Sequence, residues 1–130
     1  MKKTINEWLI VSSLVIILAL LWMSNAHAFQ SYKFVELEQL STHTEEYNAE
    51  EVQTKGKIVQ IDSYTGRYGG QYIGIVLEHG ITVYVYITEL PSRFSVGDMI
   101  LVDGRFHVYS LFGGSTHDNY IATHHLEKIE

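Results

Sequence analysis

Apolar and polar residues alternate along most of the chain after residue 51, which is the period that a half-buried strand shows. In the first such stretch Val52, Thr54 and Ile58 share one face, while Lys55 and Lys57 take the other. Residues that favour turns, mostly glycine, separate the stretches. The pattern predicts five strands, at residues 51–63, 72–78, 82–88, 99–109 and 120–128.

The segment before these strands has a helical spacing instead. Phe34, Leu37 and Leu40 lie three residues apart, which places them on one face of a short helix. Thr42 followed by Glu45 matches a capping box and predicts a further helical turn, near residues 45–48. Loops or turns are predicted at residues 65–70, 79–80, 90–94 and 111–119.

The first 28 residues have the organisation of a secretory signal. Two lysines precede an apolar run over residues 8–23, and Ala26 and Ala28 supply small residues at the spacing that a signal peptidase accepts. We therefore expect residues 1–28 to be removed and residues 29–130 to be exported, to the periplasm or the extracellular side.

The alternative for the same segment is a retained membrane anchor. The apolar run over residues 8–23 is shorter than the roughly 20 residues of a spanning helix. However, Trp8 and Trp22 lie near its ends, as interfacial aromatic residues do in membrane spans. The chain has no cysteine, so a lipidated cysteine, disulfides and thiol catalysis are all excluded.

Five strands within about eighty residues predict a small, strongly curved sheet. Gly56 and Gly104 fall in mid-strand, where glycine permits a bend or bulge. A sheet that closes on itself has no exposed edges. We therefore expect an all-β domain, a five-stranded Greek-key barrel of the OB-fold type at residues 51–130, preceded by a short helical or loop segment at residues 29–50.

Two stretches carry a resemblance to a known family. Residues 46–58 resemble the first strand of bacterial OB-fold domains, and residues 94–105, with Gly97-Asp98 and Gly104, resemble their fourth strand. The chain is similar to the tRNA-anticodon-binding-like OB families, which include exported members. The resemblance implies a barrel of the nucleic-acid-binding type. The helix usual between its third and fourth strands is reduced here to residues 90–94, so Leu37 and Leu40 are expected to cover the open end of the barrel.

Charge argues against a polyanionic ligand. The whole chain has a formal charge of −6, and loss of residues 1–28, which contain Lys2, Lys3 and Glu7, changes it to −7. Phosphate backbones are bound mainly by lysine and arginine. Single-stranded nucleic acid is therefore an alternative partner, and a protein or an envelope polymer is the first expectation.

Tyrosine supplies the main candidate binding residues. Tyr72, Tyr84 and Tyr86 alternate with aliphatic residues in the second and third strands, so they are expected on the outer face, where OB-folds bind ligands. The other interpretation is that these rings only stabilise a half-exposed sheet. Further candidate binding residues, on the flanking loops and the first strand, are Tyr64, Arg67, Tyr68, Phe112 and Lys57.

Histidine supplies a third hypothesis, a protein that handles metal or haem. His117, Asp118 and either His124 or His125 could meet across the last hairpin, although no zinc-binding spacing is present, and we assign no metal site and no cofactor. The chain also lacks a G-x-S-x-G nucleophile elbow and a phosphate-binding glycine loop. We therefore predict a binding protein without enzymatic activity.

Overall fold

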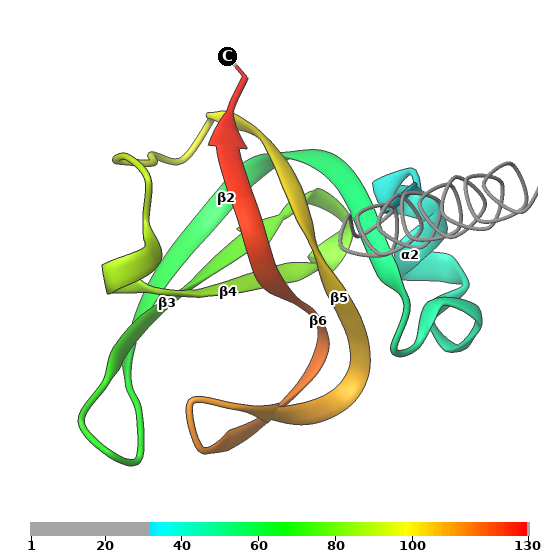
Figure 1. Ribbon diagram of the computed structural model, residues 1–130. Helices are drawn as coiled ribbons and strands as arrows, with labels where there is room; N and C mark the ends of the chain where they lie inside the picture. Colours follow the sequence, from blue (N-terminus) through cyan, green and yellow to red (C-terminus); the bar gives the residue numbers. More distant parts are fainter. Residues whose placement is uncertain (1–31, 130) are drawn as a thin grey trace, which may run out of the picture. The chain divides into compact units, whose positions relative to one another are not determined.

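The computed structural model describes residues 32–129 (Figure 1), so the predictions of a signal peptide and of a membrane anchor lie outside the described residues. Within the described part, no helix has the length and apolar character needed to cross a membrane. This part is mostly β, with one six-stranded sheet and little helix. Its strands are β1 (Lys33–Phe34), β2 (Glu51–Thr65), β3 (Gln71–Leu77), β4 (Thr82–Tyr86), β5 (Met99–Phe112) and β6 (Ser115–Lys128). Its helical segments are α2 (Leu37–Thr42) and the 3-10 turns η1 (Thr44–Tyr47), η2 (Glu78–Gly80) and η3 (Ile87–Glu89).

The sheet closes on itself through β2. Residues 51–57 of β2 pair antiparallel with β5, and residues 58–65 pair antiparallel with β3. β3 continues to β4, β4 pairs in parallel with β6 over three residue pairs, and β6 returns to β5. The pairings β2–β3–β4–β6–β5–β2 therefore form a ring, to which β1 adds a short parallel strand beside the start of β2.

Both mid-strand glycines lie where the chain packs closely, and each is near a bulge. At Gly104 an added Cβ would collide with the backbone oxygen of Ala122, and the register of β5 against β6 shifts between Asp103 and Gly104. At Gly56 an added Cβ would lie 2.7 Å from Leu37 Cδ2. The register of β2 against β3 shifts a little later, between Ile58 and Gln60. The predicted bends are thus present and mark where the long strands curve.

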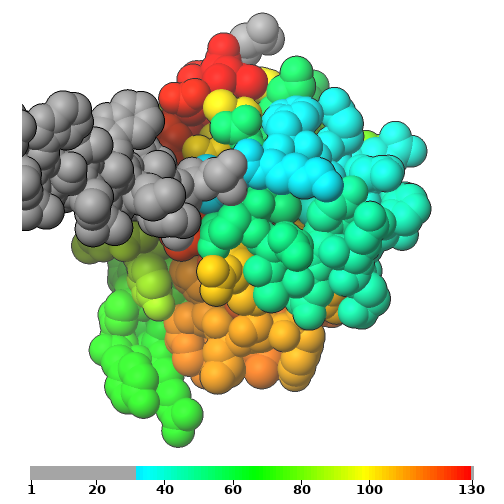
Figure 2. Space-filling model, turned by 45° about the vertical axis from the view of Figure 1, so that its right-hand side comes forward, coloured from blue at the N-terminus to red at the C-terminus, as the bar shows by residue number. Residues whose placement is uncertain are grey.

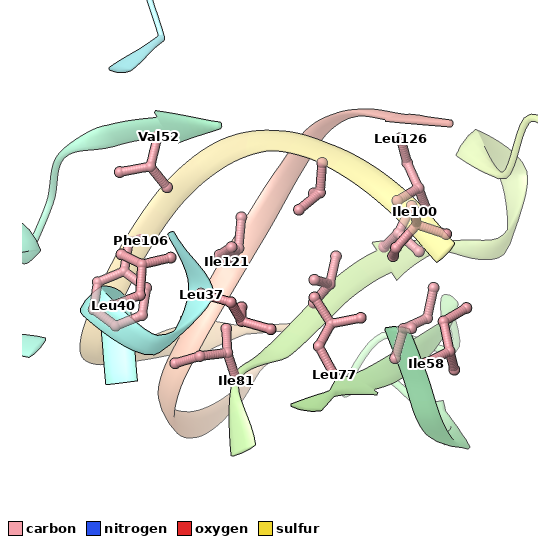
Figure 3. Close-up of a cluster of buried hydrophobic side chains, with 14 of the residues drawn as sticks. Leu37, Leu40, Val52, Ile58, Leu77, Ile81, Ile100, Phe106, Ile121 and Leu126 are labelled. Carbon is pink, nitrogen blue, oxygen red and sulfur yellow. The ribbon is translucent and has the colours of Figure 1, made fainter. Parts of the chain in front are cut away.

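The main core lies inside the ring. The inward-facing residues of β2 are buried as the alternation predicts, including Val52 and Ile58. Helix α2 contributes Leu37 and Leu40, which are buried in the same cluster, and Figure 3 shows them among the side chains of the sheet. Full burial of a leucine contributes about 1.5–3 kcal/mol. The expectation that these two leucines cover the core is confirmed.

Two local predictions were wrong. The helical turn predicted near residues 45–48 is present as η1, but Thr42 does not cap it: the residue that precedes η1 is His43, and the Thr42 hydroxyl donates to the Glu38 carbonyl oxygen at 2.9 Å. The loop predicted at residues 111–119 is a two-residue turn, since Phe112 pairs directly with Ser115. Gly113 and Gly114 have φ values of 62° and 84°, which a tight hairpin turn requires. β5 and β6 therefore stay paired up to this turn and form one long hairpin.

Candidate functional site

The three tyrosines predicted to share a face do lie together. The ring centroids of Tyr72 and Tyr84 are 5.8 Å apart, and those of Tyr72 and Tyr86 are 6.1 Å apart. The prediction that this face is open was wrong. Tyr72 is 2% exposed and Tyr84 is 7% exposed, and only Tyr86 is partly accessible. A ligand cannot stack on the first two rings in this arrangement.

The end of the β5–β6 hairpin covers these rings. Phe112 lies nearly parallel to Tyr84 and Tyr86, with centroids at 5.5 and 5.0 Å and interplanar angles of 26° and 27°. His117 lies 4.2 Å from the Tyr84 ring, and its Nε2 forms a 3.1 Å hydrogen bond with the Tyr72 hydroxyl. We call the whole group the tyrosine cluster, and it comprises Tyr64, Tyr72, Tyr84, Tyr86, Phe112, His117 and Tyr120.

Three members of this arrangement were missed in the sequence. Gly74 leaves room for the rings, because a Cβ there would lie 2.8 Å from Tyr84 Cε1 and 3.1 Å from Tyr64 Cε2. His117 and Tyr120 reach the same cluster although strict alternation places them on opposite faces. Asn119 lies between them with a φ of 48°, which interrupts the alternation of β6. A glycine opposite aromatic residues was the one signal in the sequence that could have revealed the close packing.

Burial raises the pKa of three phenols of the cluster. Loss of solvation raises the pKa of Tyr84 well above its ordinary value, and the neighbouring Tyr64 adds to the effect. Burial likewise raises the pKa of Tyr72 and of Tyr120. These hydroxyls therefore do not act as acids or bases near neutral pH.

The accessible part of the predicted site is the place where two hairpin loops meet. The Arg67 backbone N–H in the β2–β3 loop donates to the Gly113 carbonyl oxygen in the β5–β6 turn at 3.0 Å. Figure 1 shows the two loops at the same end of the sheet, and in Figure 2 the bright green β2–β3 loop projects beside the orange hairpin. Tyr68 at the loop tip is 93% exposed. A hollow of about 420 Å³ lies here, lined by Gly66, Arg67, Tyr68, Gly70, Tyr86, Gly113 and Gly114.

Lys57 does not belong to this site. It pairs with Met99 in the part of β2 that faces β5, whereas Tyr64 lies in the part that faces β3. Seven residues of strand separate Lys57 from Tyr64, which is up to about 23 Å along the chain. Arg67 is therefore the one cation among the residues that line the hollow.

The histidines predicted to share a metal do not converge. His117 is enclosed by aromatic rings, His124 Nε2 lies 3.4 Å from Glu51 Oε2, and His125 Nε2 lies 3.6 Å from Glu127 Oε2. Among residues 32–129, no three histidine, aspartate or glutamate side chains are grouped so that they could hold a metal ion. The bulge in β6 opposite Asp103 and Gly104 directs His124 toward Glu51 and away from the hairpin tip.

Comparison with known proteins adds no assignment. No family model matches the chain, and no curated protein matches it. The function must therefore be argued from the two joined loops and from the aromatic rings beneath them.

Proposed function

We propose that the chain is an exported, non-catalytic binding module built on a five-stranded barrel of the OB type. The ring of pairings through β2, with β4 and β6 parallel, supports this architecture. The short β1 and helix α2 are additions at its start, and α2 takes the covering role that the helix between the third and fourth strands has in related barrels.

The observation that carries the proposal is the hollow between the two loops. It combines one cation, Arg67, with the exposed ring of Tyr68 and the half-buried ring of Tyr86. The remaining lining is glycine, so a ligand can approach the backbone there without meeting a side chain. Aromatic rings, an arginine and an unobstructed backbone together suit a protein segment or a polymer of the cell envelope.

Single-stranded nucleic acid fits these residues less well. Such ligands need successive exposed rings and a basic groove, whereas Tyr72 and Tyr84 are buried and the hollow contains a single arginine. The charge of −7 on residues 29–130 would also weaken binding to phosphates. The metal hypothesis loses its basis because its histidines lie apart.

The test is an amide NMR titration of the protein purified as the cell exports it. The probes are a peptidoglycan fragment, a peptide library fraction and an oligothymidylate, each at low and at physiological salt. We expect shifts at Gly66, Gly70, Gly113 and Gly114 with an envelope polymer or peptide that persist at physiological salt. Shifts with the oligothymidylate alone would favour nucleic acid instead.

Tyr68→Ala should abolish the response in this titration, whereas Tyr109→Ala, which removes another exposed tyrosine outside the hollow, should leave it unchanged. A response that survives Tyr68→Ala, or shifts spread over the whole sheet, would contradict the proposed site.

A further inference from the structure

The tip of the β5–β6 hairpin makes the same kind of contact that a ligand would make with the predicted binding face. Phe112 stacks on Tyr84 and Tyr86 at angles under 30°, and a planar group of a ligand would stack on these rings in the same way. Gly113 lies directly on the Tyr72 ring, where any Cβ would collide with it. The hairpin tip therefore occupies the face of the tyrosine rings on which a ligand would stack.

Few polar contacts fasten this tip to the rest of the fold. The Arg67 N–H bonds the Gly113 carbonyl oxygen at 3.0 Å, and the Tyr120 hydroxyl donates to the Leu111 carbonyl oxygen at 3.1 Å. A third contact is the hydrogen bond between the Tyr72 hydroxyl and His117 Nε2, at 3.1 Å. The side chains of Ser115 and Ser110 add interactions with the hydroxyls of Tyr72 and Tyr120.

The other side of the tip is open to solvent. Tyr109 is 69% exposed and Leu111 is 65% exposed, so the tip is packed on one side only. At its base, Asn119 has a left-handed backbone conformation that departs from the regular strand. The tip is therefore a hairpin with its own cross-strand pairing, held down along one face and joined to the sheet at an irregular residue.

We propose that residues 109–118 form a self-blocking strap, which lifts from the tyrosine cluster as an intact hairpin and so makes Tyr72 and Tyr84 available to the partner. This inference rests on the proposed function, because it describes what happens to the binding site when the two loops separate: Tyr72 and Tyr84 become accessible beside Arg67, Tyr68 and Tyr86. The partner would bind the open form. Its apparent affinity would equal its affinity for the open form multiplied by the fraction of molecules that are open.

The strap can be tested without a ligand. Hydrogen exchange of the Arg67 amide reports release of Gly113, and acetylation of Tyr72 and Tyr84 by N-acetylimidazole reports exposure of the rings. The amides of Ile100 and Phe106, in the buried part of β5, report global unfolding. We expect the Arg67 amide and the two tyrosine hydroxyls, each measured against its own unprotected rate, to be about 100-fold less protected than the amides of Ile100 and Phe106.

A pair of matched variants separates the strap from simple fluctuation of the β2–β3 loop. Tyr120→Phe removes only the hydroxyl that donates to Leu111. That bond is absent both in the open strap and in the unfolded chain, so the variant should accelerate Arg67 exchange, the acetylation of Tyr72 and the global-unfolding exchange of Ile100 and Phe106 by the same factor, about 5-fold. Tyr109→Phe makes the same chemical change at an exposed ring of the hairpin and should alter none of these rates.

Three results would overturn the strap. Arg67 exchange that Tyr120→Phe leaves unchanged, while Ile100 and Phe106 exchange faster, would show a loop fluctuation. Arg67 exchange as slow as that of Ile100 and Phe106 would show that Gly113 is released only when the whole domain unfolds. Acetylation of Tyr72 and Tyr84 at the rate of core unfolding would show that the cluster never opens alone. Because no ligand is used, these results are independent of the titration, which tests the hollow and the proposed function.

Discussion

The Tyr72 hydroxyl and His117 Nε2 are 3.1 Å apart although the two residues are 45 positions apart in the chain. The hydrogen bond ties β3 to the far end of the β5–β6 hairpin. It lies inside a cluster where Tyr72 is almost fully buried, so its loss would leave a polar group with little access to water.

His117→Leu should therefore lower the free energy of unfolding by about 1–3 kcal/mol, since the buried Tyr72 hydroxyl loses this partner. Urea unfolding followed by circular dichroism measures the change. In the double variant with Tyr72→Phe the hydroxyl is absent, so removing His117 should cost less than it does in the wild type. Strictly additive losses would show that the hydrogen bond contributes nothing.

Gly74→Ala should destabilise the domain by about 1–3 kcal/mol, because the new methyl group would press on the rings of Tyr84 and Tyr64 within a packed cluster. The matched control is Gly70→Ala, whose Cβ would meet only Tyr86 Cε1 at an ordinary 3.8 Å. The control should change the unfolding free energy by less than about 0.5 kcal/mol. Equal effects at the two glycines would contradict the close packing at Gly74.

Stability should fall at alkaline pH. Burial raises the folded-state pKa of Tyr72, Tyr84 and Tyr120 above the ordinary value of 10.0, so above that pH the unfolded chain releases protons that the folded chain retains. The stabilisation is complete below pH 10 and is lost as the pH rises toward the folded-state pKa values, by up to about 1.4 kcal/mol per pH unit for each tyrosine.

The measurement is a series of urea unfolding curves between pH 8.5 and 11. Tyr84→Phe should make the decline above pH 10 shallower, because one of the shifted phenols is then missing. A decline with the same slope in this variant would mean that Tyr84 ionises equally in both states.

If residues 1–28 are a cleaved signal, the exported protein should begin at Phe29, and its intact mass will show this directly. Ala28→Asp should block cleavage and leave the full chain in the membrane fraction. A wild-type protein of full mass in that fraction would favour the retained anchor.

The strands and the main core could be predicted from the sequence because they follow simple periodicities. Val52 and Ile58 are buried as the alternation requires, and Leu37 and Leu40 reach the core from α2 as their spacing indicates. The cover of the tyrosine cluster could not be predicted in this way. It depends on Gly113 and on Asn119. The left-handed backbone conformation of Asn119 lets His117 and Tyr120, which strict alternation would place on opposite faces of β6, reach the same cluster.

The prediction of the candidate site was therefore right about which rings lie together and wrong about their exposure to solvent. Alternation placed Tyr72 and Tyr84 on the same face, but period alone does not tell whether a face meets solvent or another part of the chain. Lys57 was grouped with them because it is one of the few basic residues that could accompany the rings. The curvature of β2, which turns from β5 to β3 after residue 57, takes Lys57 away from the rings.

Glu51 pairs with Arg105, 54 positions later, and the two also form an ion pair at 2.8 Å. The first long strand therefore stays half unpaired until most of the chain has been synthesised, and the ring closes only when β6 is present. Contacts so distant in sequence make folding slow. In a chain that emerges N-terminus first, the edge of β2 is therefore exposed until β5 has followed it.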